Sequence, residues 1–213
     1  GTNSQTIFPP PQLKYYLSKI LSENGKTQFK TAETEKYAHI TYFFNGGREE
    51  VFDGEERKLI PSLPEATFAK NPQMKAHEIA EEVVKAVNSK AYDFILANFA
   101  NADMVGHAGD YDATVKAIEV IDECIGKIMN SAIESGYALI ITADHGNAEQ
   151  KINTLTGEAL TEHTSNPVPV YLIMDELKRE KTPEKIAELK NPNNIKGILQ
   201  DISATVLDLM GIP

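Results

Sequence analysis

The stretch YDFILANFANADMVGH, residues 92–107, joins an apolar run to a group of polar side chains. The run is rich in aromatic and aliphatic residues and predicts a buried strand over residues 92–99. Asp103 and His107 follow shortly after the end of this strand. Open α/β sheets place their polar sites at the carboxyl ends of strands. The stretch therefore predicts both an α/β fold and part of a site.

Two other clusters in the chain have the same character. The stretch YALIITADHGN, residues 137–147, contains a predicted strand followed directly by Asp144 and His145. His163 lies in EHTSNP, just before the apolar run PVPVYLIM. Two aspartates and three imidazoles are thus expected beside the ends of apolar strands.

Carboxylate and imidazole groups together suit Mn²⁺ or Zn²⁺, whereas Mg²⁺ and Ca²⁺ prefer shells made of oxygen alone. We therefore predict a metal site built from the three clusters: Asp103, His107, Asp144, His145 and His163. Each cluster alone would also fit an ordinary cap or turn, and it is their joint occurrence that favours metal. The remaining histidines lack such company. We expect His39 to pack or form hydrogen bonds and His77 to face solvent.

The rest of the chain alternates between helical and strand patterns. Apolar residues at helical spacing predict helices over residues 13–23, 76–88, 112–134, 181–190 and 197–210. Runs rich in β-branched and apolar residues predict strands over residues 27–32, 92–99, 137–142 and 167–174. Such alternation is typical of a three-layer α/β sandwich with a mostly parallel sheet covered on both faces. We find no internal linker and expect residues 1–213 to form a single domain.

Three segments are harder to assign. ETEKYAHITYFFNGG, residues 33–47, has the composition of a strand, but Thr34 as N-cap and the closing glycines favour a helix, which we prefer. NADMVGH, residues 101–107, is expected to be a loop because Gly106 weakens a helix. GREEVFDGEERKLIPSLP, residues 47–64, is polar and turn-rich and is expected to be a surface excursion.

Charge and composition exclude several classes of function. The 213 residues carry a net charge of −10, which argues against nucleic acid but not against a phosphorylated small molecule held through cations. There is no apolar run of about 18 residues, so no membrane span is expected. The single cysteine, Cys124, falls in an apolar helical stripe and is expected to be a buried, inert thiol. This cysteine usage fits a reducing compartment, and we expect a cytoplasmic protein.

The five predicted ligands are too few for two complete metal sites. A catalytic zinc-type site needs about three protein ligands and an open position, and a pair of ions needs about twice that number. Asp53 and Glu149 are further candidates, but both lie in polar, turn-rich sequence. Neither Thr142, which ends a strand, nor Ser165, which precedes Asn-Pro, is placed as a nucleophile at the start of a helix. Part of the site is therefore expected to lie outside these residues.

Four motifs resemble those of the cofactor-independent (2,3-bisphosphoglycerate-independent) phosphoglycerate mutases: AETEKYAHITYFFNGG, NFANADMVGHAG, ITADHGNAEQ and EHTSNPVP. The resemblance runs from about Phe8 to Gly211. It implies an alkaline-phosphatase-like metal domain, of which this chain resembles the C-terminal segment. The N-terminal segment and the inserted phosphotransferase domain of the family have no counterpart here.

The resemblance also implies roles for single residues. Asp103, His107 and His163 would bind one divalent cation, and Asp144 with His145 would contribute to a second. The family's remaining ligands, an Asp and the nucleophilic Ser, lie in sequence that this chain lacks, in agreement with the shortage of ligands. Mn²⁺ is the expected ion, with Zn²⁺, Co²⁺ or Mg²⁺ as alternatives.

Lys36, in ETEKYAH, would contact the phosphoryl group or the nucleophile and so serve catalysis and substrate binding. The implied reaction interconverts 3-phosphoglycerate and 2-phosphoglycerate through a phosphoserine. The full-length protein is expected to be a monomer that acts on this small phosphorylated substrate. The present chain, without the nucleophile, is expected to be inactive by itself.

Two other readings stay open at this point. One is another metal-dependent enzyme on the same scaffold, such as a phosphatase, a sulfatase or a phosphopentomutase, because that superfamily shares its metal ligands. The other is a catalytically silent metal-binding module. The residues between the metal ligands within the four motifs favour the phosphoglycerate mutase over these alternatives.

Overall fold

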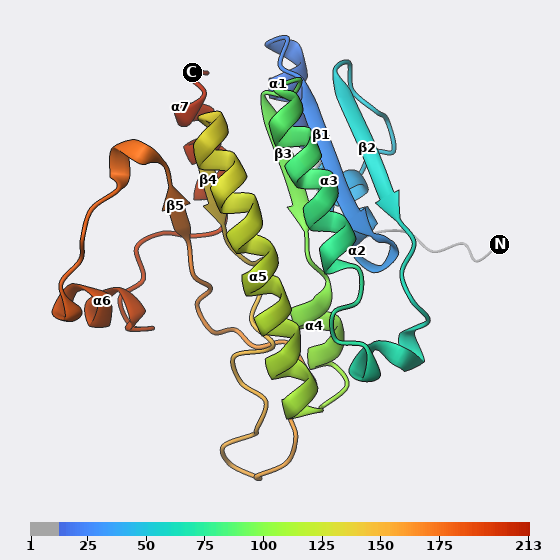
Figure 1. Cartoon of the computed structure of the whole chain (residues 1–213), viewed down its shortest axis with the longest axis vertical. Helices are drawn as coiled ribbons and strands as arrows, with labels where there is room; N and C mark the ends of the chain where they lie inside the picture. The colour runs from blue at the N-terminus through green and yellow to red at the C-terminus, as the bar shows by residue number, and fades with distance from the viewer. Residues whose placement is uncertain (1–12) are drawn as a thin grey trace, which may run out of the picture.

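The computed structural model describes residues 13–213, and its centre is a parallel three-stranded sheet (Figure 1). The strands are β1 (Gln28–Glu33), β2 (Glu55–Ile60) and β3 (Phe94–Asn98), in the order β2-β1-β3. All six residues of β1 are buried, as befits the central strand. Gln28 pairs with Glu55 on one side and with Phe94 on the other, so the three strands point the same way and their carboxyl ends share one edge.

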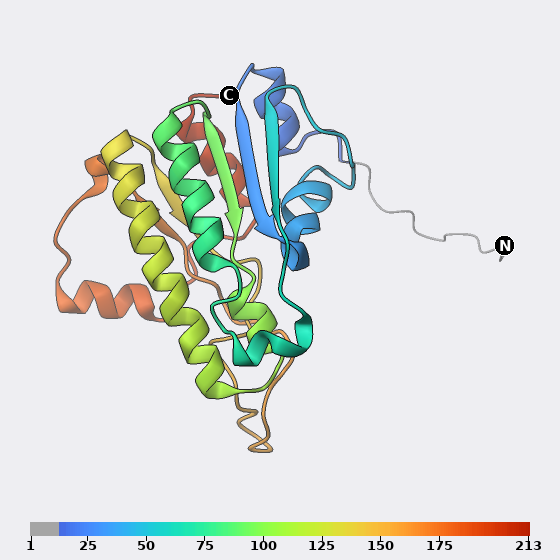
Figure 2. The same cartoon turned by 45° about the vertical axis from the view of Figure 1, so that its right-hand side comes forward.

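Helices cover both faces of the sheet, as Figures 1 and 2 show. On one face lie α3 (Ala76–Ser89) and α5 (Tyr111–Ser135), which pack against Ile95 of β3. On the other lie α1 (Leu17–Glu23) and α7 (Asp201–Leu209), which pack against Phe94. Neighbouring residues of a strand point to opposite faces, so this alternation defines three layers. The predicted α/β class is confirmed.

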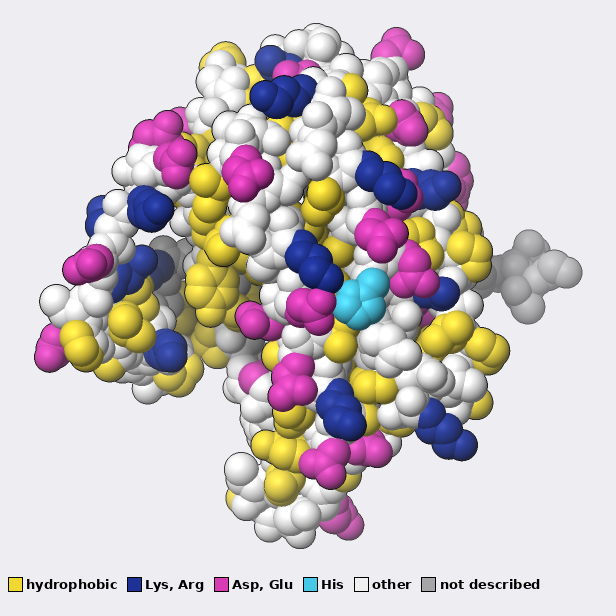
Figure 3. All heavy atoms as spheres, in the orientation of Figure 1, with side chains coloured by type: hydrophobic (Ala, Val, Ile, Leu, Met, Phe, Trp, Pro, Cys, Tyr) yellow, Lys and Arg dark blue, Asp and Glu magenta, His cyan; other side chains and the backbone are white. Residues whose placement is uncertain are grey.

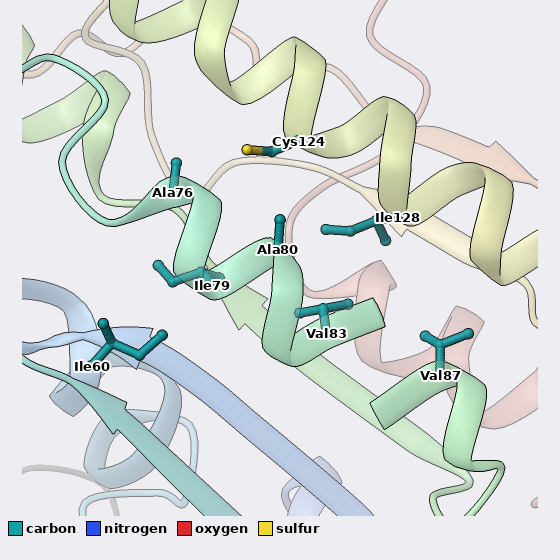
Figure 4. Close-up of a cluster of buried hydrophobic side chains, with 8 residues drawn as sticks. All are labelled: Ile60, Ala76, Ile79, Ala80, Val83, Val87, Cys124 and Ile128. Atoms are coloured by element: carbon teal, nitrogen blue, oxygen red, sulfur yellow. The ribbon is translucent and has the colours of Figure 1, made fainter. Parts of the chain in front are cut away.

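The main core forms between α3 and α5, where apolar residues recur at helical spacing (Figure 4). Ala76 and Ala80 of α3 point toward Cys124 and Ile128 of α5, and Ile79 and Val83 belong to the same buried cluster. Cys124 is fully buried, as expected, and burial raises the pKa of its thiol. His77 was expected to face solvent but is half-buried, with Nδ1 3.5 Å from the Cys124 sulfur.

The outer surface of these two helices carries acidic and basic side chains side by side (Figure 3). Lys85 pairs with Glu82 and Lys127 with Glu123, at 2.8 and 2.6 Å. This mixture is the solvated exterior of an amphipathic helix. In the described part of the chain, no helix is both long and apolar enough to span a bilayer.

A second, antiparallel sheet stands beside the first. It consists of β4 (Leu139–Ile141) and β5 (Tyr171–Ile173), with Ile140 opposite Leu172. Both predicted strands exist, but they form a separate pair, whereas one mostly parallel sheet was expected. The core around α5 reaches Leu139 as well as Ile95, so one helix covers both sheets.

Helical elements also follow the carboxyl ends of the strands. Segment 33–47 forms α2 (Thr34–Ala38) and a π-helical turn (His39–Phe43), which confirms the preferred helix. The remaining elements are short: 3₁₀ turns at Glu65–Lys70 and Asp175–Leu177, and α6 at Pro183–Lys190.

Two sequence-based assignments are wrong. Residues 47–64 contain the edge strand β2 rather than a surface loop. The sequence did not reveal this strand because its residues are charged, and yet Glu55 is buried against Lys30. Residues 101–107 form α4 (Asn101–Gly106) rather than a loop. A single glycine costs a helix only about 1 kcal/mol, and packing of Val105 into the core offsets it.

Candidate metal centre

Asp103, His107 and His163 converge at the carboxyl edge of the parallel sheet. Their ligand atoms all lie within 4.8 Å of one another. Asp103 Oδ1 is 3.1 Å from His107 Nε2 and 3.0 Å from His163 Nε2, and the two nitrogens are 3.1 Å apart. Helix α4 makes this possible, because residues four apart share one helical face. Its backbone bond from His107 N–H to the Asp103 carbonyl, 3.0 Å, carries the helix as far as His107.

His145 lies next to His163, and the exposed side chain of Asp144 lies near His145. The His145 ring stacks on that of His163, with centroids 3.7 Å apart and an interplanar angle of 21°. Asp144 Oδ2 lies 3.6 Å from His145 Nε2, and its side chain is largely exposed. Asp144 and His145 lie in the loop that begins after the end of β4 at Ile141.

Lys36 adds a positive charge from α2. Its Nζ lies 2.5 Å from Asp103 Oδ2, and both side chains are almost buried, at 10% and 13% exposed. Burial alone would raise the pKa of Asp103, but hydrogen bonds from Lys36 and Asn147 outweigh it and lower the pKa to about 2. The carboxylate is therefore ionised at neutral pH.

The chemistry of these donors fits a divalent cation. His107 Nδ1 lies 2.6 Å from the Thr161 carbonyl, which can only accept, so in the neutral imidazole Nδ1 carries the hydrogen and Nε2 carries the lone pair that a cation needs. A metal-binding histidine usually has its other nitrogen held in this way. One carboxylate oxygen and two imidazole nitrogens form a donor set suited to first-row transition ions.

A layer of residues that the sequence reasoning overlooked lies behind Asp103. Asn147 Nδ2 donates to Asp103 Oδ1 at 2.8 Å, and Lys151 Nζ donates to Asn147 Oδ1 at 2.5 Å. Glu149, considered above as a ligand, accepts instead from the Asn147 backbone, the Thr164 hydroxyl and Asn166. It thereby joins the loop after β4 to the loop of His163. The one feature of the sequence that could have pointed to these residues is that Asn147 immediately follows the motif ADHG in the chain.

Two other residues considered from sequence have different places. Asp53 precedes β2, so it lies at the amino end of a parallel strand, opposite the edge that carries the centre. His39 is exposed, and its ring lies 5.5 Å from that of Phe43. Partial desolvation of the ring and the charge of Lys36 lower the pKa of His39, although the carboxylates of Asp144 and Asp103 act to raise it. His39 is thus a neighbour of the centre, which its sequence context did not reveal.

Comparison with known proteins agrees with this arrangement. The family model described as the metalloenzyme superfamily matches residues 3–213. The chain is 49% identical over 207 residues to a 2,3-bisphosphoglycerate-independent phosphoglycerate mutase of Methanosarcina acetivorans, covering 97% of this chain and 38% of that protein. It is 44% identical over 211 residues to the mutase of the same description from Clostridium botulinum, covering 99% and 39%.

A crystal structure of Leishmania mexicana phosphoglycerate mutase at low cobalt concentration is also similar in fold. It superposes with a TM-score of 0.74 at 31% identity, covering 90% of this chain and 36% of that one. The chain thus spans less than half the length of the relatives it matches. With a family match over nearly its whole length, the chain belongs to the metalloenzyme superfamily.

Proposed function

We propose that this chain is the metal-binding part of a 2,3-bisphosphoglycerate-independent phosphoglycerate mutase. The longer protein would interconvert 3-phosphoglycerate and 2-phosphoglycerate through a phosphoserine. The observation that carries the proposal is the convergence of Asp103, His107 and His163, within 4.8 Å of one another, with Lys36 on the same carboxylate. The similarity to two mutases at 44–49% identity supports this substrate over those of other metal-dependent phosphatases.

Residues 1–213 would form one unit, the C-terminal part of the metal domain. The nucleophilic serine, the remaining ligands of the second ion and the phosphotransferase domain would come from the rest of the protein. The share of the relatives that the chain covers, 38% and 39%, fits this division. We expect the full-length protein to be a cytoplasmic monomer.

Two divalent cations would be held by the residues at the carboxyl edge of the sheet. Asp103, His107 and His163 would hold one, and Asp144 with His145 would contribute to the other. Mn²⁺ is our first choice, and Zn²⁺, Co²⁺ and Mg²⁺ are alternatives. Bound cations would neutralise the phosphoryl oxygens and lower the barrier to attack by the serine.

Lys36 would serve the substrate as a compact positive charge. An ammonium group has three donors, and only one points at Asp103 Oδ2. The other two could bind a phosphoryl oxygen at the same edge of the sheet. The pairing with Asp103 would hold Lys36 in place before the substrate arrives.

The test begins with the metal. Equilibrium dialysis should show that the chain binds Mn²⁺, and His107→Ala should lower the affinity at least tenfold because one of three donors is lost. His77→Ala, which alters a histidine between α3 and α5, is the matched control and should bind normally. In the full-length protein, His107→Ala should also abolish mutase activity in an enolase-coupled assay. Full activity with unaltered metal content would refute the proposal.

A further inference from the structure

We propose that Asn147, held by the buried Lys151, is the positioning residue for Asp103 and limits this carboxylate to one oxygen donor toward the cation. The inference rests on the proposed function, in that it concerns the same metal centre. It adds a determinant of metal affinity and selectivity, built from residues that would not touch the ion.

Asn147 is placed to fix the carboxylate. It is 3% exposed, and its Nδ2 donates to Asp103 Oδ1 at 2.8 Å and to the Asp103 backbone carbonyl at 3.3 Å. The residue comes from the loop after β4, whereas Asp103 belongs to α4. These two bonds therefore tie the loop that carries Asp144 and His145 to the helix that carries Asp103 and His107.

Lys151 determines which way the Asn147 carboxamide faces. Its side chain is buried, with the residue 6% exposed, and its Nζ lies 2.5 Å from Asn147 Oδ1. An ammonium group can only donate, so the carboxamide must turn its oxygen to Lys151 and its amino group to Asp103. The backbone of Lys151 is fixed too, because its carbonyl accepts from Leu160 N–H at 2.9 Å.

Gly106 leaves the space that the carboxamide needs. A Cβ atom at this position would overlap the side chain of Asn147. The residue lies between Asp103 and His107 in α4, where an alanine would otherwise favour the helix. The glycine thus permits close contact between the helix and the Asn147 loop.

The result is a carboxylate with both oxygens engaged. Lys36 binds Oδ2 and Asn147 binds Oδ1, so Asp103 cannot turn to offer both oxygens to one ion. Ca²⁺ takes six to eight oxygen ligands and often uses bidentate carboxylates, whereas first-row ions accept one oxygen and two imidazoles. These hydrogen bonds from Lys36 and Asn147 to Asp103 therefore favour the binding of ions such as Mn²⁺ over the binding of Ca²⁺.

The experiment compares the wild-type chain with Lys151→Met, Gly106→Ala and the control Lys116→Met. Lys116→Met removes one positive charge from the exposed surface of α5. Calorimetric titration gives the affinities for Mn²⁺ and Ca²⁺, the visible spectrum of the Co²⁺ complex reports ligand geometry, and thermal unfolding in EDTA reports metal-free stability. Lys151→Met and Gly106→Ala should each weaken Mn²⁺ binding about 10- to 100-fold and alter the Co²⁺ spectrum. The preference for Mn²⁺ over Ca²⁺ should narrow, and Lys116→Met should behave as wild type.

The outcomes separate this inference from the proposed function. If the wild type binds Mn²⁺ and both variants bind it equally well with an unchanged Co²⁺ spectrum, the positioning role is overturned and the metal site stands. If the wild type binds no metal, both are overturned. Gly106→Ala keeps every charge and donor, so it decides the matter if Lys151→Met fails to fold.

Discussion

Asp103 is partly buried and Glu33 is fully buried, and their surroundings shift the pKa values of the two carboxylates in opposite directions. Asp103 receives a charged donor from Lys36 and an amide donor from Asn147. Glu33 is fully buried, and among residues 13–213 its side chain accepts from the Ser62 hydroxyl at 3.0 Å and the Lys75 backbone N–H at 3.4 Å. Burial therefore dominates and raises the pKa of Glu33. A nearby positive charge thus lowers the pKa of a buried carboxyl, whereas without one desolvation raises it.

Glu33→Gln should raise the free energy of unfolding at neutral pH. A carboxyl whose folded pKa is raised favours folding below its unfolded pKa, about 4.3, and this contribution is lost as pH rises through the folded pKa. Glutamine has no charge to bury and can still bond Ser62. Urea unfolding in EDTA should show the variant more stable than wild type at pH 7, with the gap closing toward pH 4.

The matched control for this prediction is Glu35→Gln, which changes an exposed carboxylate two residues away. It should leave the stability near that of wild type at both pH values. A Glu33→Gln variant that is less stable than wild type at pH 7 would show that ionised Glu33 is needed by the fold.

At the scale of elements, a buried ion pair joins β1 to β2. Lys30 Nζ lies 2.8 Å from Glu55 Oε1, and both side chains are fully buried. Lys30 also donates to Ser18 and Asn45, at 2.7 and 2.8 Å. Burial alone would raise the pKa of Glu55, but bonds from Arg57 and Lys30 hold it below its usual value. The network pairs Glu55 and Arg57, two of the charged residues of an edge strand whose sequence looked like a solvated loop.

Glu55→Ala should destabilise the chain by about 3–5 kcal/mol, because it leaves Lys30 buried without a counter-charge. Chemical denaturation measures the loss. Replacing both partners, as Lys30→Met with Glu55→Leu, should recover much of it by removing the unpaired charge. The control Glu49→Ala alters an exposed acid and keeps the backbone carbonyl that Arg57 contacts. A loss below about 1 kcal/mol for Glu55→Ala would mean that water reaches Lys30.

At the scale of the whole molecule, buried side chains are concentrated in some parts of the chain and absent from the segment 175–193. Clusters of buried apolar side chains surround α3, α5 and the parallel sheet. By contrast, every residue from 175 to 193 is exposed, including Ile186 and Leu189 of α6. In Figure 1 this segment extends away from the sheets. Segments with few buried contacts open at low free-energy cost.

Limited trypsin digestion should therefore cut first between residues 178 and 196. This segment contains Lys178, Arg179, Lys181, Lys185, Lys190 and Lys196. Mass spectrometry of early products would identify the bonds. Lysines of α3 and α5, such as Lys85 and Lys127, are internal controls, because their exposed side chains sit on helices packed into the core. First cuts in those helices would contradict this distribution of stability.

The elements that could be predicted from the sequence are those that depend on interactions between residues close together in the chain. Helices α3 and α5 and strands β3 and β4 could be predicted, because their apolar periodicity reports a local geometry and a buried face. Strand β2 could not be, because Lys30, which neutralises Glu55, lies 25 residues earlier in the chain. Helix α4 was missed because Gly106 counts against a helix locally, while its benefit, contact with Asn147, comes from a distant loop.

The same division holds for the candidate centre. The sequence by itself determined which donors stand at strand ends, because carboxylate and imidazole groups beside apolar runs are a local pattern. Only the tertiary structure decided that Asp103, His107 and His163 meet within 4.8 Å and that Asn147 and Lys151 stand behind them. The physical reason is that packing of separate segments sets distances between them, and local periodicity carries no information about that packing.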